Sequence, residues 1–152
     1  MTIPSEVTQW RPRAYVRVIS IGVVRRGDDL LVAPVYASDG QVKGWRPLGG
    51  GVELGETAAA ALKREFWEEL NREARITSEP FVFENIYQHE GATGHEVVFA
   101  FAAEVDGLGR EPPVMVEGEL AVPTAWVPLG VFLAGDQELY PAGLAELVEE
   151  RF

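Results

Sequence analysis

Three glutamates stand close together in one segment, and their spacing suits the binding of divalent metal ions. Glu65, Glu68 and Glu69 are separated by three and four positions, so on an α-helix they share one face. Like charges at this spacing destabilise a helix by about 0.2–0.5 kcal/mol per pair. A cation such as Mg²⁺ offsets the repulsion, because it takes hard oxygen ligands and keeps positions open for substrate phosphates. The cluster therefore predicts a metal site that serves phosphate chemistry.

A glycine-rich stretch precedes the predicted helix. Gly49, Gly50 and Gly51 let the backbone approach a ligand and offer carbonyl oxygens, and we expect the last two to contact substrate. Glu56 stands near the helix start, where the helix dipole favours a carboxylate. Arg64 lies within the acidic segment and is placed to hold one of its carboxylates in a single rotamer while offsetting the charge.

Together these residues resemble the Nudix box, whose pattern is G-x5-E-x7-R-E-U-x-E-E-x-G-U, with U a bulky aliphatic residue. The segment 50–72 reads GGVELGETAAAALKREFWEELNR. The residues that match the pattern are Gly50, Glu56, Arg64, Glu65, Glu68 and Glu69. Phe66, Asn71 and Arg72 depart from it, in place of an aliphatic residue, a glycine and an apolar residue. None of these departures touches a carboxylate, and Asn is the next-best residue for a left-handed helix end.

The resemblance to the Nudix family implies an α+β fold, an α/β/α sandwich around a central mixed β-sheet. It implies that the three clustered glutamates ligate Mg²⁺ or Mn²⁺, with the Gly49 carbonyl as a further ligand. Glu56 and Arg64 would form an orienting pair behind these ligands. The implied reaction is attack of a metal-activated water on a phosphorus of a nucleoside diphosphate derivative, with a carboxylate taking the proton.

Nudix proteins often recruit an additional carboxylate from outside the box, and three glutamates are candidates for that role here. Glu119 is the first choice, because it precedes Trp126 at a plausible distance. Glu96 opens a predicted strand beside a histidine and is the second choice, and Glu117 is the third.

Substrate contacts are also expected from side chains outside the box. Arg46, just before the glycine stretch, is suited to clamping a phosphate. Tyr87 is suited to stacking on a nucleobase, and Glu96 is assigned to the same substrate site. The substrate is left open among oxidised nucleoside triphosphates, nucleotide sugars, ADP-ribose, dinucleoside polyphosphates and RNA 5′ ends, because the box does not select among them.

Three classes of function are weighed. A metal-dependent pyrophosphohydrolase leads, because every carboxylate of the box is present. A non-catalytic nucleotide-binding or regulatory Nudix-fold domain is the alternative, which loss of those carboxylates would indicate. An isomerase of isoprenyl diphosphates on the same fold is disfavoured, because that chemistry is expected to need a cysteine and the sequence contains none.

Length and charge narrow the class of protein. The 152 residues suit one domain, and we expect a single Nudix domain over 1–152. The net charge of −11 disfavours a general nucleic-acid binder and favours a small nucleotide as partner. The start, MTIPSEVTQWRPR, lacks the apolar run of a signal peptide, and no stretch is long enough to span a membrane. A cytoplasmic location is the default expectation, and homodimerisation is left open.

Apolar periodicity and turn residues predict the elements around the box. Strands are expected over 15–24, 30–36, 81–88, 96–105 and 126–128. Helices are expected over 57–70, with Thr57 as N-cap and Asn71 at its end, and over 141–151. Loops are expected over 89–95 and over 107–123, a stretch with three prolines and three glycines.

Overall fold

The computed structural model describes residues 10–152, so most of the segment used for the signal-peptide prediction lies outside the described part. The strands are β1 (Arg17–Arg26), β2 (Asp29–Tyr36), β3 (Val42–Arg46), β4 (Leu48–Gly51), β5 (Ala74–Ile76), β6 (Phe81–His89), β7 (Ala92–Val105), β8 (Val114–Glu117), β9 (Leu120–Pro123) and β10 (Ala125–Pro128). The helices are α2 (Ala58–Leu70), α3 (Leu129–Leu133) and α4 (Leu144–Arg151). Within residues 10–152, no helix is long and apolar enough to cross a membrane.

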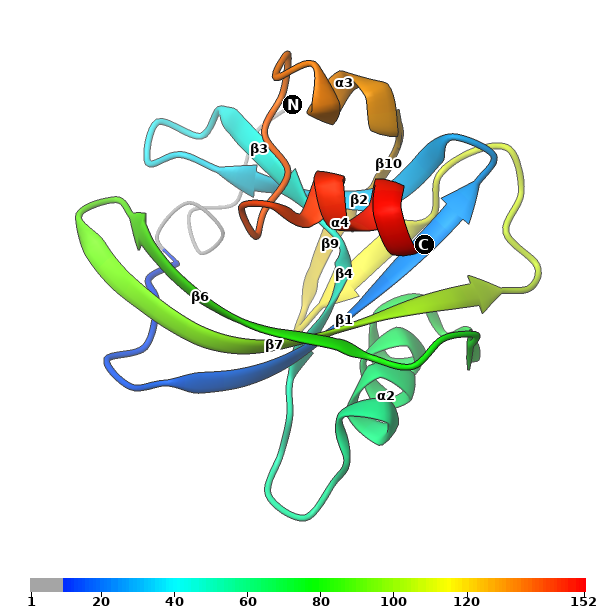
Figure 1. Ribbon diagram of the computed structural model, residues 1–152, viewed down its shortest axis with the longest axis horizontal. Helices are drawn as coiled ribbons and strands as arrows, with labels where there is room; N and C mark the ends of the chain where they lie inside the picture. The colour runs from blue at the N-terminus through cyan, green and yellow to red at the C-terminus, as the bar shows by residue number, and fades with distance from the viewer. Residues whose placement is uncertain (1–9) are drawn as a thin grey trace.

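Strand β1 organises a mixed sheet, as the resemblance implied (Figure 1). It pairs in parallel with β7, residues 17–24 against 96–103. On its other side it pairs antiparallel with β4 and, near its end, with β2. The main path runs β10-β2-β1-β7-β5, with β3 paired to β2 and β6 paired to β7. The predicted α+β class with a central mixed sheet is confirmed.

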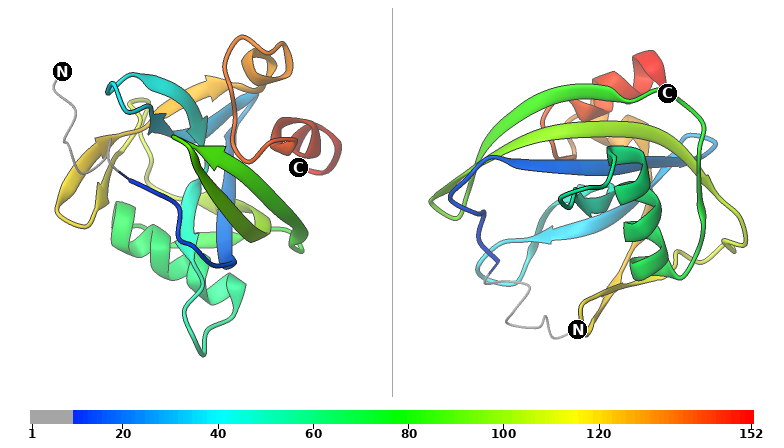
Figure 2. Two further views of the ribbon diagram at one scale, coloured as in Figure 1. Left: turned by 90° about the vertical axis from the view of Figure 1, so that its left-hand side faces the viewer. Right: turned by 90° about the horizontal axis from the view of Figure 1, so that it is seen from below.

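Helices cover both faces of the sheet (Figure 2). Helix α2 lies on one face, and α3 and α4 lie on the other. Each face has its own buried core. Members of the core under α2 include Leu31, Leu48, Leu62, Phe66, Phe101, Met115 and Val122. Members of the core under α3 and α4 include Ile21, Leu30, Val98, Phe132, Leu144 and Val148. These layers make the predicted α/β/α sandwich.

The loop prediction for 107–123 is wrong, because this stretch contains the β8–β9 hairpin. Its prolines and glycines lie mostly outside the paired residues, and the turn falls at Gly118, whose φ is +63°. Met115 and Val122 face α2 and are almost fully buried. Two short apolar runs, 114–116 and 120–122, on each side of a Glu-Gly-Glu turn were the signal for this hairpin.

The loop prediction for 89–95 is also wrong. Strands β6 and β7 continue to a tight turn at Glu90 and Gly91, which have φ values of +49° and +82°. Two consecutive residues with positive φ form the turn that matches the twist of a hairpin.

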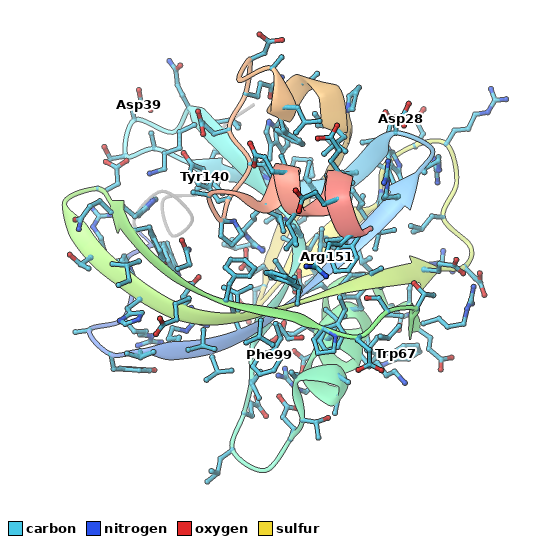
Figure 3. All side chains as sticks on the ribbon, viewed as in Figure 1. Asp28, Asp39, Trp67, Phe99, Tyr140 and Arg151 are labelled. Atoms are coloured by element: carbon cyan, nitrogen blue, oxygen red, sulfur yellow. The ribbon has the colours of Figure 1, made fainter. Side chains whose placement is uncertain are left out.

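The terminal helix begins at Leu144, three residues later than expected. Before it, the segment with Tyr140 lies against β3, whose Trp45 carbonyl accepts from the Tyr140 N–H at 2.8 Å (Figure 3).

The two caps predicted for the box helix are confirmed. Thr57 Oγ1 accepts a hydrogen bond from the Ala60 N–H at 3.1 Å. Asn71 ends the helix in the left-handed conformation, with φ +52°, and its N–H donates to the Trp67 carbonyl at 2.9 Å. Asparagine therefore adopts the left-handed conformation at the position where the box pattern has glycine.

Substitution of Asn71 tests how much the left-handed end of α2 contributes to stability. Asn71→Ala is expected to lower the free energy of unfolding by about 1 kcal/mol, because a Cβ without a polar group is disfavoured at positive φ. Asn71→Gly is the matched control and should be as stable as the wild type or more so. Urea unfolding of the three proteins measures the difference, and equal stability of the alanine and glycine variants would contradict it.

His89, at the tip of the β6–β7 hairpin, should make stability depend on pH. It is buried and its ring meets Trp10 edge-on, with centroids 5.2 Å apart. Burial lowers the pKa of His89, the charges of Lys43 and Arg11 add to that effect, and the Glu90 charge and the Trp10 backbone oppose it in part. A histidine with a folded-state pKa below its unfolded value stabilises fully above the unfolded value, near 6.5, and this contribution is lost as the pH falls.

We therefore expect the free energy of unfolding to fall more steeply between about pH 7.5 and 5 in the wild type than in His89→Phe. Denaturant unfolding at a series of pH values measures the two slopes. Parallel curves for the two proteins would show that His89 has no part in the pH dependence.

Candidate active site

The apolar side of α2 fixes the direction of its acidic face. Leu62 and Phe66 are fully buried, and the Phe66 ring lies against Gly22 of β1. A Cβ at Gly22 would come within 2.8 Å of that ring. The aromatic departure at Phe66 is thus accommodated by a glycine on the facing strand. Ser20 Oγ, also on β1, donates to the Ala58 carbonyl at 2.8 Å and holds the helix start against the sheet.

Glu65 lies on the side of α2 that faces β4, and the Glu69 carboxylate is within hydrogen-bonding reach of it. A Cβ at Gly50 would come within 2.5 Å of the Glu65 carboxylate, so the close approach requires a glycine. Glu69 is only 7% exposed, and its Oε2 is buried without a hydrogen-bond partner in residues 10–152. Burial raises the pKa of Glu69 to about 8, Arg46 opposes the shift, and the Glu65 hydrogen bond and charge add to it. A desolvated carboxylate beside a second carboxylate is a position that a cation would stabilise.

Arg64 joins the helix to the loop before it. Its Nε and Nη2 donate to the two oxygens of Glu56 at 3.1 and 2.6 Å. Nη2 also donates to the Gly51 carbonyl at 2.9 Å. Nη1 turns to the acidic face and donates to Glu65 at 3.0 Å and to Glu68 at 3.3 Å. The two residues that the resemblance pairs are in direct contact, and the same guanidinium holds two of the clustered glutamates.

Glu56 is fixed from two directions. Besides Arg64, the backbone N–H of Glu53 donates to its Oε1 at 2.8 Å. The hydrogen bond from Arg64 lowers the pKa of Glu56, and the Glu53 N–H adds to that effect. Glu56 therefore stays ionised and orients Arg64 from behind.

Arg46 and Glu117 lie beside the carboxylate pair. Arg46 Nη2, at the end of β3, is 3.3 Å from Glu117 Oε1, at the end of β8. Both charges act on the pKa of Glu69, which Arg46 lowers and Glu117 raises. Both side chains are partly exposed, and such pairs contribute only about 0–1 kcal/mol. Either group is therefore free to turn toward a ligand at low cost.

The other predicted residues occupy three further places. Glu119 lies in the exposed turn between β8 and β9, and its side chain makes no hydrogen bond or ion pair with residues 10–152. Tyr87 and Glu96 lie on β6 and β7, on the sheet face opposite to α2, and the Tyr87 hydroxyl is 3.2 Å from Glu96 Oε1. The Gly49 backbone has φ +147° and runs close to Ser20. The structure thus brings Glu117, but not Glu119, to the carboxylate pair.

The donor set fits a hard divalent cation in part. In the described chain no three His, Asp or Glu side chains converge closely enough to hold a metal ion, and Arg64 engages Glu68 and one oxygen of Glu65. Two carboxylates do meet, and the buried, unpartnered Oε2 of Glu69 points to a missing ligand. Mg²⁺ is usually held by one or two carboxylates together with water and substrate phosphates. The pair formed by Glu65 and Glu69 therefore meets its requirement.

Comparisons with known proteins bear on the fold and on the family of this chain. The family model described as NUDIX domain matches residues 16–148. A search of curated proteins finds no match. A NUDIX hydrolase from Nitrosomonas europaea superposes with a TM-score of 0.66 at 18% identity, over 89% of this chain and 87% of that one.

Two further solved structures share the architecture. A MutT NUDIX hydrolase from Burkholderia pseudomallei has a TM-score of 0.62 and 22% identity, over 90% of this chain and 98% of its own. An ADP-ribose pyrophosphatase from Streptococcus suis has a TM-score of 0.58 and 14% identity, over 90% and 92%. At these identities the neighbours establish a shared fold, while the family match rests on the sequence.

Proposed function

The chain belongs to the NUDIX domain family, and on that premise we propose that it is a metal-dependent pyrophosphohydrolase. Its substrate would be a nucleoside diphosphate joined to another group, as in a nucleoside triphosphate, a nucleotide sugar or ADP-ribose. The family match over 16–148 supports the further proposal that the chain acts as one domain. Cytoplasmic location and homodimerisation stay predictions.

One observation carries the proposal: the buried Glu69 carboxylate lies beside Glu65 with an oxygen that no described residue satisfies. Such a group is costly unless a ligand completes it. Gly50 is kept free of a side chain at the same point, which leaves the backbone close to Glu65. These features suit a bound cation more than a structural ion pair.

Glu65 and Glu69 would hold Mg²⁺ or Mn²⁺, with Glu68 and the Gly49 carbonyl as further ligands. When bound, the ion would lower the pKa of a water and neutralise charge on the phosphates. Arg64, held by Glu56, would keep Glu65 and Glu68 in place. Arg46 would bind a phosphate oxygen, a task that its planar fork of donors suits.

Glu117 is the outside carboxylate that we propose for proton transfer or as an additional ligand. Its contact with Arg46 and its effect on Glu69 support this choice. Glu119 lies in the exposed turn that follows Glu117, and Glu96 lies on the opposite face of the sheet. Glu117→Gln should then reduce turnover strongly, with Glu119→Gln as the matched control on the same hairpin.

The test is a product-resolved cleavage screen. The full chain is incubated with nucleoside triphosphates, nucleotide sugars, ADP-ribose, dinucleoside polyphosphates and 5′-triphosphorylated RNA, in Mg²⁺, Mn²⁺ or chelator, and products are separated by chromatography. Metal-dependent cleavage at a pyrophosphate linkage is the expected result. Absence of cleavage across the panel, together with tight nucleotide binding, would replace the hydrolase with the non-catalytic binding domain.

A further inference from the structure

Glu96 of β7 is a second buried carboxylate, separate from those of α2. The residue is only 8% exposed. Within residues 10–152 its side chain has one hydrogen-bond partner, the Tyr87 hydroxyl at 3.2 Å, and no ion pair within 4.0 Å. A carboxylate accepts about four hydrogen bonds. Oε2 of Glu96 makes none with residues 10–152 and is not fully enclosed, so it is available to accept from the donors of a ligand.

Tyr87 offers a flat surface next to this carboxylate. It is paired with Gly94 across the hairpin, and a Cβ at Gly94 would collide with the Tyr87 ring and hydroxyl. The ring therefore lies flat over the β7 backbone, with its hydroxyl reaching Glu96. The Gly94 side of the ring is covered, and because Tyr87 is only half-buried, part of its side chain remains accessible to a ligand. Aromatic rings presented in this way stack on nucleobases.

Arg17 connects this group to the glycines of the box. In the parallel pair of β1 and β7, Arg17 stands beside Glu96, and both point to the sheet face opposite to α2. Its Nη2 would lie 3.1 Å from a Cβ placed on Gly51. Successive glycines of β4 therefore face in opposite directions, Gly50 toward Glu65 and Gly51 toward Arg17. A ligand that crosses these glycines would have its phosphates near α2 and its nucleoside near Glu96.

We infer that Tyr87 and Glu96 bind the nucleobase and that Glu96 selects a base with two adjacent N–H donors on one edge, the arrangement found in guanine. The inference rests on the proposed function, because it places the nucleoside of the substrate of that same site. Tyr87 supplies the stacking surface for the base, Glu96 accepts hydrogen bonds from the base N–H groups, and Arg17 donates to phosphate oxygens of the nucleotide.

The selectivity follows from the pattern of donors and acceptors on each base. A carboxylate accepts well from the ring N–H and the amino group of guanine, which lie side by side. Adenine and cytosine place an acceptor nitrogen next to the amino group, and uracil flanks its single N–H with two carbonyls. Those acceptors would face the negative charge of Glu96 without a hydrogen bond. Sites that bury polar groups discriminate strongly against ligands that leave them unpaired.

Binding of nucleoside monophosphates tests the inference without requiring hydrolysis. Titration calorimetry of the full chain in Mg²⁺ with GMP, AMP, CMP and UMP should show GMP as the tightest ligand by about 10-fold or more. Glu96→Gln should weaken GMP by about 10-fold or more and change the other three by less than about 3-fold. Glu84→Gln, a largely exposed residue on the same hairpin, is the control and should leave all four affinities unchanged.

A second pair of variants separates stacking from a structural role. Tyr87→Leu should weaken all four nucleotides by about 10-fold, and Tyr87→Phe, which keeps the ring, should change them by only a few-fold. Equal affinity of the wild type for the four nucleotides, or an equal loss for all four in Glu96→Gln, would overturn the inference. Cleavage without base preference would overturn this inference alone, and GMP preference without cleavage would overturn the proposed hydrolase alone.

Discussion

The Glu69→Gln variant is expected to lose at least about 100-fold in kcat for pyrophosphate cleavage while folding as stably as the wild type or more so. Glutamine keeps the size of the side chain and removes its charge. Loss of a group that only orients a metal ligand already lowers metal affinity or activity by about 10–100-fold, so loss of the ligand itself should lower activity at least as much. Burying the charged Glu69 carboxylate away from water costs folding free energy. A neutral amide at this position should avoid part of that cost, so the variant should be at least as stable as the wild type.

Steady-state kinetics on the substrate found in the screen, together with thermal unfolding with and without Mg²⁺, measure both effects. Mg²⁺ should raise the Tm of the wild type and leave that of Glu69→Gln nearly unchanged, because a ligand stabilises only the state that binds it. Glu73→Gln, an exposed glutamate just beyond α2, is the matched control and should behave as the wild type. Full activity in Glu69→Gln and in Glu68→Gln would rule out the metal mechanism.

The box was predictable because its chemistry depends on local spacing. Glu65, Glu68 and Glu69 fall on one face of any helix, and Thr57 and Asn71 mark where that helix begins and ends. Gly22, which accommodates Phe66, is distant in sequence and could not have been recognised beforehand. The departure at Arg72 has a similar explanation, since its guanidinium lies against Gly107 in the turn after β7.

The residues that come from outside the box were harder to place, because their positions depend on strand pairing. A loop over 107–123 gives no reason to prefer Glu117 to Glu119. Once β8 is recognised as a strand, Glu117 is its last residue and meets Arg46 of β3, whereas Glu119 lies in the turn. Tyr87 and Glu96 were both assigned to substrate, but only the pairing of β6 with β7 shows that they touch each other.

Arg64→Ala is expected to lower both activity and stability, because one guanidinium joins the loop, the helix start and the acidic face. The change removes two hydrogen bonds to Glu56 and one to the Gly51 carbonyl, as well as those to Glu65 and Glu68. Hydrogen bonds to charged groups contribute about 1.5–3 kcal/mol, and partial solvent screening reduces the sum. We expect a loss of about 2 kcal/mol in the free energy of unfolding and of about 100-fold in kcat/KM.

Arg64→Lys separates charge from geometry in the same experiment. Lysine keeps the positive charge but cannot reproduce the planar fork that meets both oxygens of Glu56. It should therefore recover most of the stability and little of the activity, because carboxylates that bind a cation need fixed orientation more than neutralisation. Denaturant unfolding and kinetics at saturating Mg²⁺ measure the two quantities. If lysine restored kcat/KM fully, Arg64 would act only as a counter-charge, and the orienting pair with Glu56 would have no part in catalysis.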